Sequence, residues 1–242
     1  MKMRVYAFLR RVVAGAIALI NLIPSIVVIF NPLFFVMFLP IGAYAILTQL
    51  WILLKDVQDP FHPGESLYWL TYAIKTDEDN ILLPTLFRWG IIDLSLLAVG
   101  SVIFLLAFAA WITNLGKGGG LLTSGIYGLV RHPQYLGLIL LTLGITIRSL
   151  RPISFIAWII LLFGYLILAS LEERDLIKKY DQRYIEYSRR TAFMIPFLRL
   201  NLPELFSPRK PYRYIVFMVL CVLLIVAVMF SMRNMVFALR GF

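Results

Sequence analysis

Long apolar stretches separated by short polar ones dominate the chain. The apolar runs lie at residues 12–30, 33–54, 89–113, 134–147, 153–171 and 214–232. A helix needs roughly 20 apolar residues to cross about 30 Å of hydrocarbon. Most of the runs have that length, whereas the fourth is short for a full span, which suggests a tight hairpin with the fifth. The pattern predicts an all-α fold, a polytopic integral-membrane helical bundle of five to six spans.

Two polar stretches have features of the membrane interface. Residues 55–88 contain an aromatic centre, residues 67–74, that is too short to span, and Trp and Tyr favour the headgroup layer. Residues 174–190 repeat apolar and tyrosine positions at three- and four-residue steps, which predicts an interfacial amphipathic helix. The repeating positions are Leu176, Ile177, Tyr180, Tyr184 and Tyr187. We interpret most of these tyrosines as packing residues.

These stretches suggest three parts. Residues 1–88 would form an N-terminal helical hairpin and interfacial loop, residues 89–200 a core, and residues 201–242 a connector and an accessory transmembrane helix.

The composition agrees with a membrane protein, since 61% of the residues are hydrophobic and 15% charged. Soluble domains are nearer half apolar and a quarter charged, roughly. The net charge of +10 would suit nucleic acid in a soluble protein, but here it indicates basic helix flanks facing anionic lipid. The chain has one cysteine, Cys221, and two histidines, His62 and His132. So few cysteines and histidines argue against a metal centre built from these ligands.

Candidate chemistry begins in residues 125–137, where Tyr127, Arg131, His132 and Tyr135 interrupt the apolar pattern. A charged group at membrane depth costs about 2.5–3.5 kcal/mol on insertion scales, so such groups tend to mark functional sites. Proline is favoured as the first residue of a helix, and Pro133 precedes an apolar run. The N–H groups of a first helical turn are a natural seat for an anion.

A second polar pair, Glu172 and Glu173, ends the fifth apolar run. If the fourth and fifth runs are antiparallel helices, this pair and the first cluster lie at the same membrane face. They would then form a pocket suited to a zwitterionic, partly aromatic ligand. The alternative is a salt bridge between Arg131 and Glu173 that only closes the hairpin. The residues leave these two interpretations open.

The combined pattern resembles a known family. Gly-x-Tyr at 125–127, Arg-His-Pro-x-Tyr-x-Gly at 131–137, Glu-Glu at 172–173 and Tyr-x-x-Tyr at 184–187 match the order and spacing of the isoprenylcysteine carboxyl methyltransferases and their prokaryotic relatives. The resemblance covers roughly residues 111–200. It implies S-adenosylmethionine as methyl donor and a lipophilic acceptor that enters from the bilayer.

By position, the resemblance implies ten cofactor-binding residues. They are Gly119, Gly120, Leu121, Leu122, Tyr127, His132, Pro133, Gln134, Tyr135 and Glu172. His132 and the N–H groups after Pro133 suit the donor's carboxylate, and Glu172 suits its ammonium or a ribose hydroxyl. Arg131 and Glu173 are the candidate catalytic residues, orienting the acceptor.

Two departures from the family concern the substrate more than the cofactor. Leu168 stands where the eukaryotic enzymes carry an arginine thought to face the substrate, and Asp181 stands in place of a usual glycine. The acceptor is therefore left open between an isoprenoid or prenylcysteine-type carboxylate, a small thiol and a phospholipid amine. Two other functions also remain: a sterol reductase-like protein that binds NADPH, and a non-catalytic membrane interaction protein.

We expect the cofactor site to face the cytoplasm, because the densest basic block, residues 174–213, then lies on the cytoplasmic side. In that arrangement the basic N-terminus lies on the opposite side, so the charge rule alone does not decide the orientation. The sequence does not specify an oligomeric state.

Overall fold

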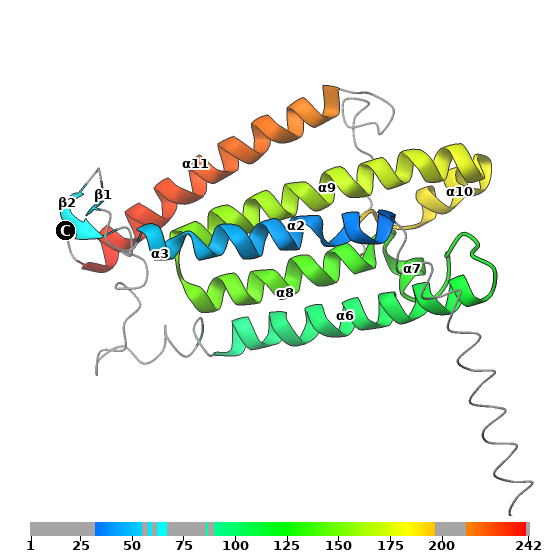
Figure 1. Ribbon diagram of the computed structural model, residues 1–242, viewed down its shortest axis with the longest axis horizontal. Coiled ribbons are helices and arrows are strands. Elements are labelled where there is room, and N and C mark those ends of the chain that lie inside the picture. Colours follow the sequence, from blue (N-terminus) through cyan, green and yellow to red (C-terminus); the bar gives the residue numbers. More distant parts are fainter. Residues whose placement is uncertain are drawn as a thin grey trace, which may run out of the picture.

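The computed structural model describes residues 32–54, 58–59, 62–66, 86, 90–196 and 212–240. The helices are α2 (Pro32–Gln49), α3 (Trp51–Leu54), α6 (Ile91–Gly116), α7 (Ile126–Leu129), α8 (Pro133–Ser149), α9 (Pro152–Tyr180), α10 (Gln182–Arg190) and α11 (Tyr212–Arg240). The strands are β1 (Gln58–Asp59) and β2 (His62–Ser66). In Figure 1 the long helices α2, α6, α8 and α9 lie side by side, with α7 and α10 at one end of the bundle.

The predicted all-α membrane fold is confirmed. Within the described residues, four helical segments are long and apolar enough to cross a membrane: Phe35–Leu53, Ile91–Gly116, Pro152–Tyr180 and Tyr214–Met232. The predicted first run, residues 12–30, lies outside the described residues, and α8 has only 17 residues. The count of five to six spans therefore stays a prediction.

The short antiparallel pair β1 and β2 was not predicted. It pairs Gln58 with Ser66 and Asp59 with His62. Both Asp59 and His62 precede a proline, and a residue before proline is restricted to extended backbone, which accounts for the local conformation. The aromatic centre at residues 67–74, predicted to be interfacial, lies outside the described residues.

The predicted hairpin of the fourth and fifth apolar runs is confirmed as α8 and α9. Helix α8 also packs closely against α6. Glycines allow the approach to α6: a Cβ atom on Gly100 would lie 2.5 Å from the backbone nitrogen of Leu141, and one on Gly137 would lie 2.6 Å from that of Phe104. Lipid tails are as apolar as the side chains of membrane helices, so no hydrophobic driving force brings these helices together. Small residues let the helices approach closely and gain van der Waals contact instead. Gly137, the last residue of the polar motif, thus serves helix packing.

The predicted amphipathic helix is present as α10, but its predicted bounds, residues 174–190, are wrong. The membrane helix α9 continues without interruption to Tyr180, and α10 is a separate nine-residue helix. Asp181 separates them with a φ of 42°, in the left-handed region. Glycine adopts this conformation most easily, and aspartate is among the few other residues that visit it. The carbonyl of Asp181 accepts hydrogen bonds from the N–H groups of Tyr184 and Ile185, so the next helix starts directly at this turn.

At the end of the bundle away from α7 and α10, an ion pair joins α6 to α8. Nε of Arg148 lies 2.9 Å from Oδ2 of the fully buried Asp93. The other oxygen of Asp93 accepts a hydrogen bond from the N–H of Gly90 at 2.8 Å. The charge of Asp93 is therefore compensated at the start of α6, which makes a structural role sufficient for it.

Candidate functional site

The polar motif folds around the start of α8. His132 occupies the position before the helix and Pro133 is its first residue, as predicted. The short helix α7 precedes them and is followed by Val130, whose backbone is extended. Because proline has no N–H to leave unpaired, the free N–H groups of the first turn begin at Gln134. The helix start therefore presents donors next to the His132 ring.

A segment that follows α10 closes over the motif. Val130 forms a parallel bridge with Ala192, and the N–H of Arg131 donates to the carbonyl of Ala192 at 2.9 Å. Phe193 then places its ring 5.2 Å from the ring of His132 and 5.3 Å from the guanidinium of Arg131. The sequence did not indicate Phe193. Residues 191–196 show no periodicity and contain no charged residue that would mark them as part of the site.

The two polar clusters meet across the α8–α9 hairpin, as predicted. Nη1 of Arg131 lies 2.6 Å from Oε1 of Glu173. The imidazole of His132 lies between the two carboxylates, with Nδ1 3.4 Å from Oε2 of Glu172 and Nε2 3.5 Å from Oε1 of Glu173. Two cations thus face two carboxylates at this end of the bundle when His132 is protonated.

The carboxylates determine the charge of His132. Burial by itself lowers the pKa of this side chain, which is 5% exposed, but the contacts with Glu172 and Glu173 outweigh burial and raise the pKa to about 9. His132 is therefore an imidazolium at neutral pH, with both ring nitrogens protonated.

A cavity of about 200 Å³ opens between these groups. All ten residues predicted to hold the cofactor line it, and so does Arg131. Glu173 is not among the lining residues but contacts two of them, Arg131 and His132. The structure thus brings together residues from four separated segments: residues 119–122, α7, the start of α8 and the end of the apolar part of α9.

The loop after α6 is shaped by glycines. Gly118 has a φ of 99° and Gly119 a φ of 65°, a region that side chains other than glycine rarely adopt. Asn114 fixes the loop, since its side-chain amide donates to the carbonyl of Gly120 at 2.8 Å and its carbonyl accepts from the N–H of Gly119 at 3.0 Å. The chain can therefore pass directly along the cavity there.

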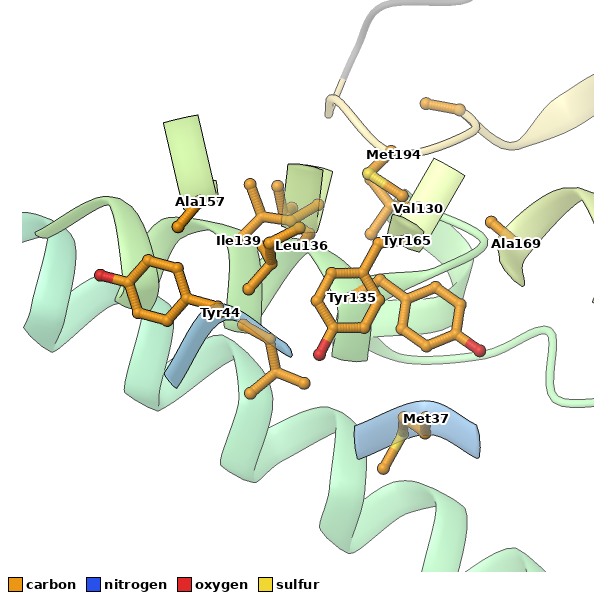
Figure 2. Close-up of a cluster of buried hydrophobic side chains, with 13 residues drawn as sticks. Met37, Tyr44, Val130, Tyr135, Leu136, Ile139, Ala157, Tyr165, Ala169 and Met194 are labelled. Carbon is orange, nitrogen blue, oxygen red and sulfur yellow. The ribbon is translucent and has the colours of Figure 1, made fainter. Parts of the chain in front are cut away.

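Tyrosines form much of the remaining wall. Tyr187 donates a hydrogen bond from its hydroxyl to the carbonyl of Tyr127 at 2.6 Å, which ties α10 to α7. The rings of His132 and Tyr135 stack with centroids 5.6 Å apart, and Tyr135 also stacks on Tyr165 at 5.0 Å. Figure 2 shows the rings of Tyr135 and Tyr165 side by side in the hydrophobic cluster. Tyr187 thus positions Tyr127, and it also lines the cavity itself.

Other lining residues were not predicted to belong to the site. They are Trp111, Asn114, Leu115, Leu176, Lys179, Tyr180, Tyr184 and Tyr187. Tyr180, Tyr184 and Tyr187 are among the repeating positions of residues 174–190, whose periodicity was visible in the sequence. The prediction of one interfacial helix placed their common face in the membrane interface, whereas the turn at Asp181 brings α10 back against the cavity.

The comparisons with known proteins concern the segment that builds this cavity. Residues 90–183 match the phospholipid methyltransferase family. Protein-S-isoprenylcysteine O-methyltransferase B of Arabidopsis thaliana is 30% identical over 79 residues, which are 32% of this chain and 40% of that protein. The protein-S-isoprenylcysteine O-methyltransferase of Saccharomyces cerevisiae is 33% identical over 79 residues, 32% of this chain and 33% of that protein.

The human protein-S-isoprenylcysteine O-methyltransferase is 29% identical over 80 residues, 33% of this chain and 28% of that protein. The matches thus cover less than half the length of each of these relatives. No solved structure matches the chain. The resemblance to membrane methyltransferases is confirmed for the segment that carries α6 to α9.

Proposed function

We propose that this protein is a membrane-embedded methyltransferase that uses S-adenosylmethionine and transfers a methyl group to a lipophilic or small acceptor. One observation carries the proposal: the ten residues that the family resemblance implies, in four segments, line one cavity. That cavity lies in the part of the chain similar to membrane methyltransferases.

The chemistry of the cavity wall fits the methyl donor. Among the described residues, Nε2 of Gln134 and Nε of Arg131 are buried donors without a hydrogen-bond partner. They lie beside the positive end of α8 and the charged ring of His132. These groups suit the carboxylate of the donor's amino-acid part, while Glu172, half exposed in the wall, suits its ammonium or a ribose hydroxyl.

S-adenosylmethionine supplies an electrophilic methyl group on a sulfonium, and transfer is a direct displacement. Tyr127 and Tyr135 offer ring faces at which a cation gains about 0.5–2 kcal/mol. Both are held in place, Tyr135 by stacking and Tyr127 by the bond from Tyr187 to its carbonyl. Alignment of the two reactants in a site shielded from water then provides most of the catalysis.

For the acceptor, we propose that Arg131 and Glu173 set its orientation. The ion pair fixes the guanidinium of Arg131. Of these two residues, Arg131 lines the cavity and Glu173 does not. A carboxylate or thiolate acceptor needs no base, whereas an amine must lose one proton. Glu172 is the carboxylate placed in the wall to accept that proton. The prenylcysteine acceptors named for the relatives are one possibility within this range.

We also propose that the cavity faces the cytoplasm and that residues 89–200 form the methyltransferase core, with the flanking parts 1–88 and 201–242 as accessory segments. The basic residues of α9 and α10 around the cavity support that side, since positive charge favours the cytoplasmic face. The NADPH-binding and non-catalytic alternatives are not favoured, because each relative compared above is named a methyltransferase.

Calorimetric titration of the detergent-purified protein with S-adenosylhomocysteine tests the proposal. We expect binding that His132→Ala and Glu172→Gln each weaken strongly. Asp175→Asn serves as the matched control, because Asp175 is an exposed carboxylate one turn further along α9 that pairs only with Lys178 in the described structure. Equal binding by the wild type and both site variants would contradict the proposal.

A further inference from the structure

Tyr184 has a buried hydroxyl that the folded protein does not use. The side chain is 1% exposed, lies on α10 and lines the cavity. No described residue satisfies its hydroxyl with good hydrogen-bond geometry, although the Arg131 guanidinium lies close enough to lower its pKa in part. A buried polar group without a partner is costly, and in native proteins such groups usually have a reason.

Two other tyrosines show that this arrangement is not general. Tyr187, on the same helix, satisfies its hydroxyl through the carbonyl of Tyr127. Tyr165, on α9, also has a buried hydroxyl without a partner in the described structure, but it does not line the cavity. Tyr184 therefore combines two properties that are separate in the others: an unused hydroxyl and a place in the cavity wall.

The surroundings of Tyr184 indicate what its hydroxyl would bind. Burial raises the pKa of Tyr184, so the hydroxyl keeps its proton and can donate it. The other unused polar atoms in the wall are also donors, namely Nε of Arg131, Nε2 of Gln134 and Nε2 of the protonated His132. Because these unused atoms are donors, they suit a group that accepts, and a carboxylate accepts about four hydrogen bonds.

Charge balance favours the same group. Arg131 and protonated His132 are offset by Glu172 and Glu173, so this cluster is close to neutral before any ligand enters, and only the exposed Lys179 adds a further charge to the wall among the described residues. A lone anion or a lone cation would disturb that balance, whereas a ligand that carries its own carboxylate together with a cation would not.

We propose that Tyr184 is a binding residue whose hydroxyl donates a hydrogen bond to the carboxylate of the methyl donor. The inference rests on the proposed function, because it assumes the donor in the cavity. It extends the donor site from α7 and α8 to α10, the helix beyond the turn at Asp181.

The test compares Tyr184→Phe with the wild type by titration with two probes. S-adenosylhomocysteine carries the amino-acid carboxylate, whereas 5′-methylthioadenosine has the adenosine and the sulfur without it. Hydrogen bonds to charged groups are the stronger ones, so we expect Tyr184→Phe to weaken S-adenosylhomocysteine binding roughly tenfold and to leave methylthioadenosine binding unchanged.

Tyr214→Phe, on α11, is the matched control, since it removes another buried hydroxyl without a partner among the described residues, away from the cavity wall. It should leave the affinity for both probes unchanged. Equal S-adenosylhomocysteine affinity in Tyr184→Phe and wild type would overturn the inference alone, and so would an equal loss for both probes. No binding of S-adenosylhomocysteine by the wild type would instead overturn the proposed function.

Discussion

Arg131 and Glu173 form an ion pair between Nη1 and Oε1 at 2.6 Å, with 16% and 7% of their side chains exposed. Arg131 directly precedes the helix start at Pro133, and Glu173 belongs to α9, so the pair closes the α8–α9 hairpin. The sequence suggested either such a closing salt bridge or a pocket. The structure contains both, because Arg131 holds Glu173 with one nitrogen and still lines the cavity.

Arg131→Met should lower the free energy of unfolding by about 3 kcal/mol, because it leaves Glu173 as a buried charge without its closest partner. The nearby His132 compensates part of that charge, which keeps the loss near the lower end of the usual range. Replacing both residues, as Arg131→Met with Glu173→Leu, should restore most of the loss. A double-mutant cycle on thermal unfolding in detergent measures the coupling, and purely additive effects would rule it out.

The protonation of His132 predicts how stability depends on pH. Its pKa is about 9 in the folded protein against 6.5 for an ordinary histidine. The group therefore contributes its full stabilisation below about pH 6.5 and loses it as the pH rises through about 9, a change of about 3 kcal/mol at most. Thermal unfolding from pH 6 to 10 should show this loss in the wild type.

His132→Asn is the reference for that experiment, because it removes the titrating ring while Glu172, Glu173 and Arg131 remain. Subtracting its pH profile isolates the contribution of His132 from those of other groups that titrate in alkali. Parallel profiles for the two proteins would show that His132 has an ordinary pKa.

The contact between α6 and α8 depends on its glycines. Gly100→Ala should destabilise the protein by about 1–3 kcal/mol, because the new Cβ atom would lie 2.5 Å from the backbone of Leu141, which cannot move away as a side chain can. Gly42→Ala, in α2, has nothing within 4 Å of its Cβ and should instead gain up to about 1 kcal/mol of helix propensity. Melting temperatures in detergent that fall for both variants would contradict this account.

Two buried tyrosines should respond oppositely to removal of the hydroxyl. Tyr44 shares a 2.9 Å hydrogen bond with Thr146 between α2 and α8, so Tyr44→Phe should cost about 1 kcal/mol. Tyr165 has no such partner within the described residues, so Tyr165→Phe should be neutral or stabilising. Thermal unfolding of the two variants side by side provides the measurement, and an equal loss in both would refute the assignment of Tyr165.

The sequence was informative where one physical rule dominates. Apolar runs long enough to span predicted α6 and α9, and Pro133 predicted the start of α8. The polar residues at the two ends of the α8–α9 hairpin also predicted that Arg131 and His132 lie near Glu172 and Glu173.

The sequence was less informative where tertiary contacts decide. Asp181 gives no strong local signal for the turn that separates α10 from α9, because aspartate is only tolerated at its positive φ. The contact of Phe193 with His132 depends on backbone pairing between residues distant in sequence, Val130 and Ala192. Whether a tyrosine hydroxyl is satisfied, as in Tyr187, or unused, as in Tyr184, cannot be read from spacing.

The identity of the bound cofactor tests the account most directly. A ligand that binds only the folded protein at one hundred times its dissociation constant stabilises it by about 2.7 kcal/mol. Thermal unfolding of the purified protein should therefore shift upward with S-adenosylhomocysteine and remain unchanged with NADPH. A shift with NADPH and none with S-adenosylhomocysteine would contradict the assignment of this cavity to a methyl donor.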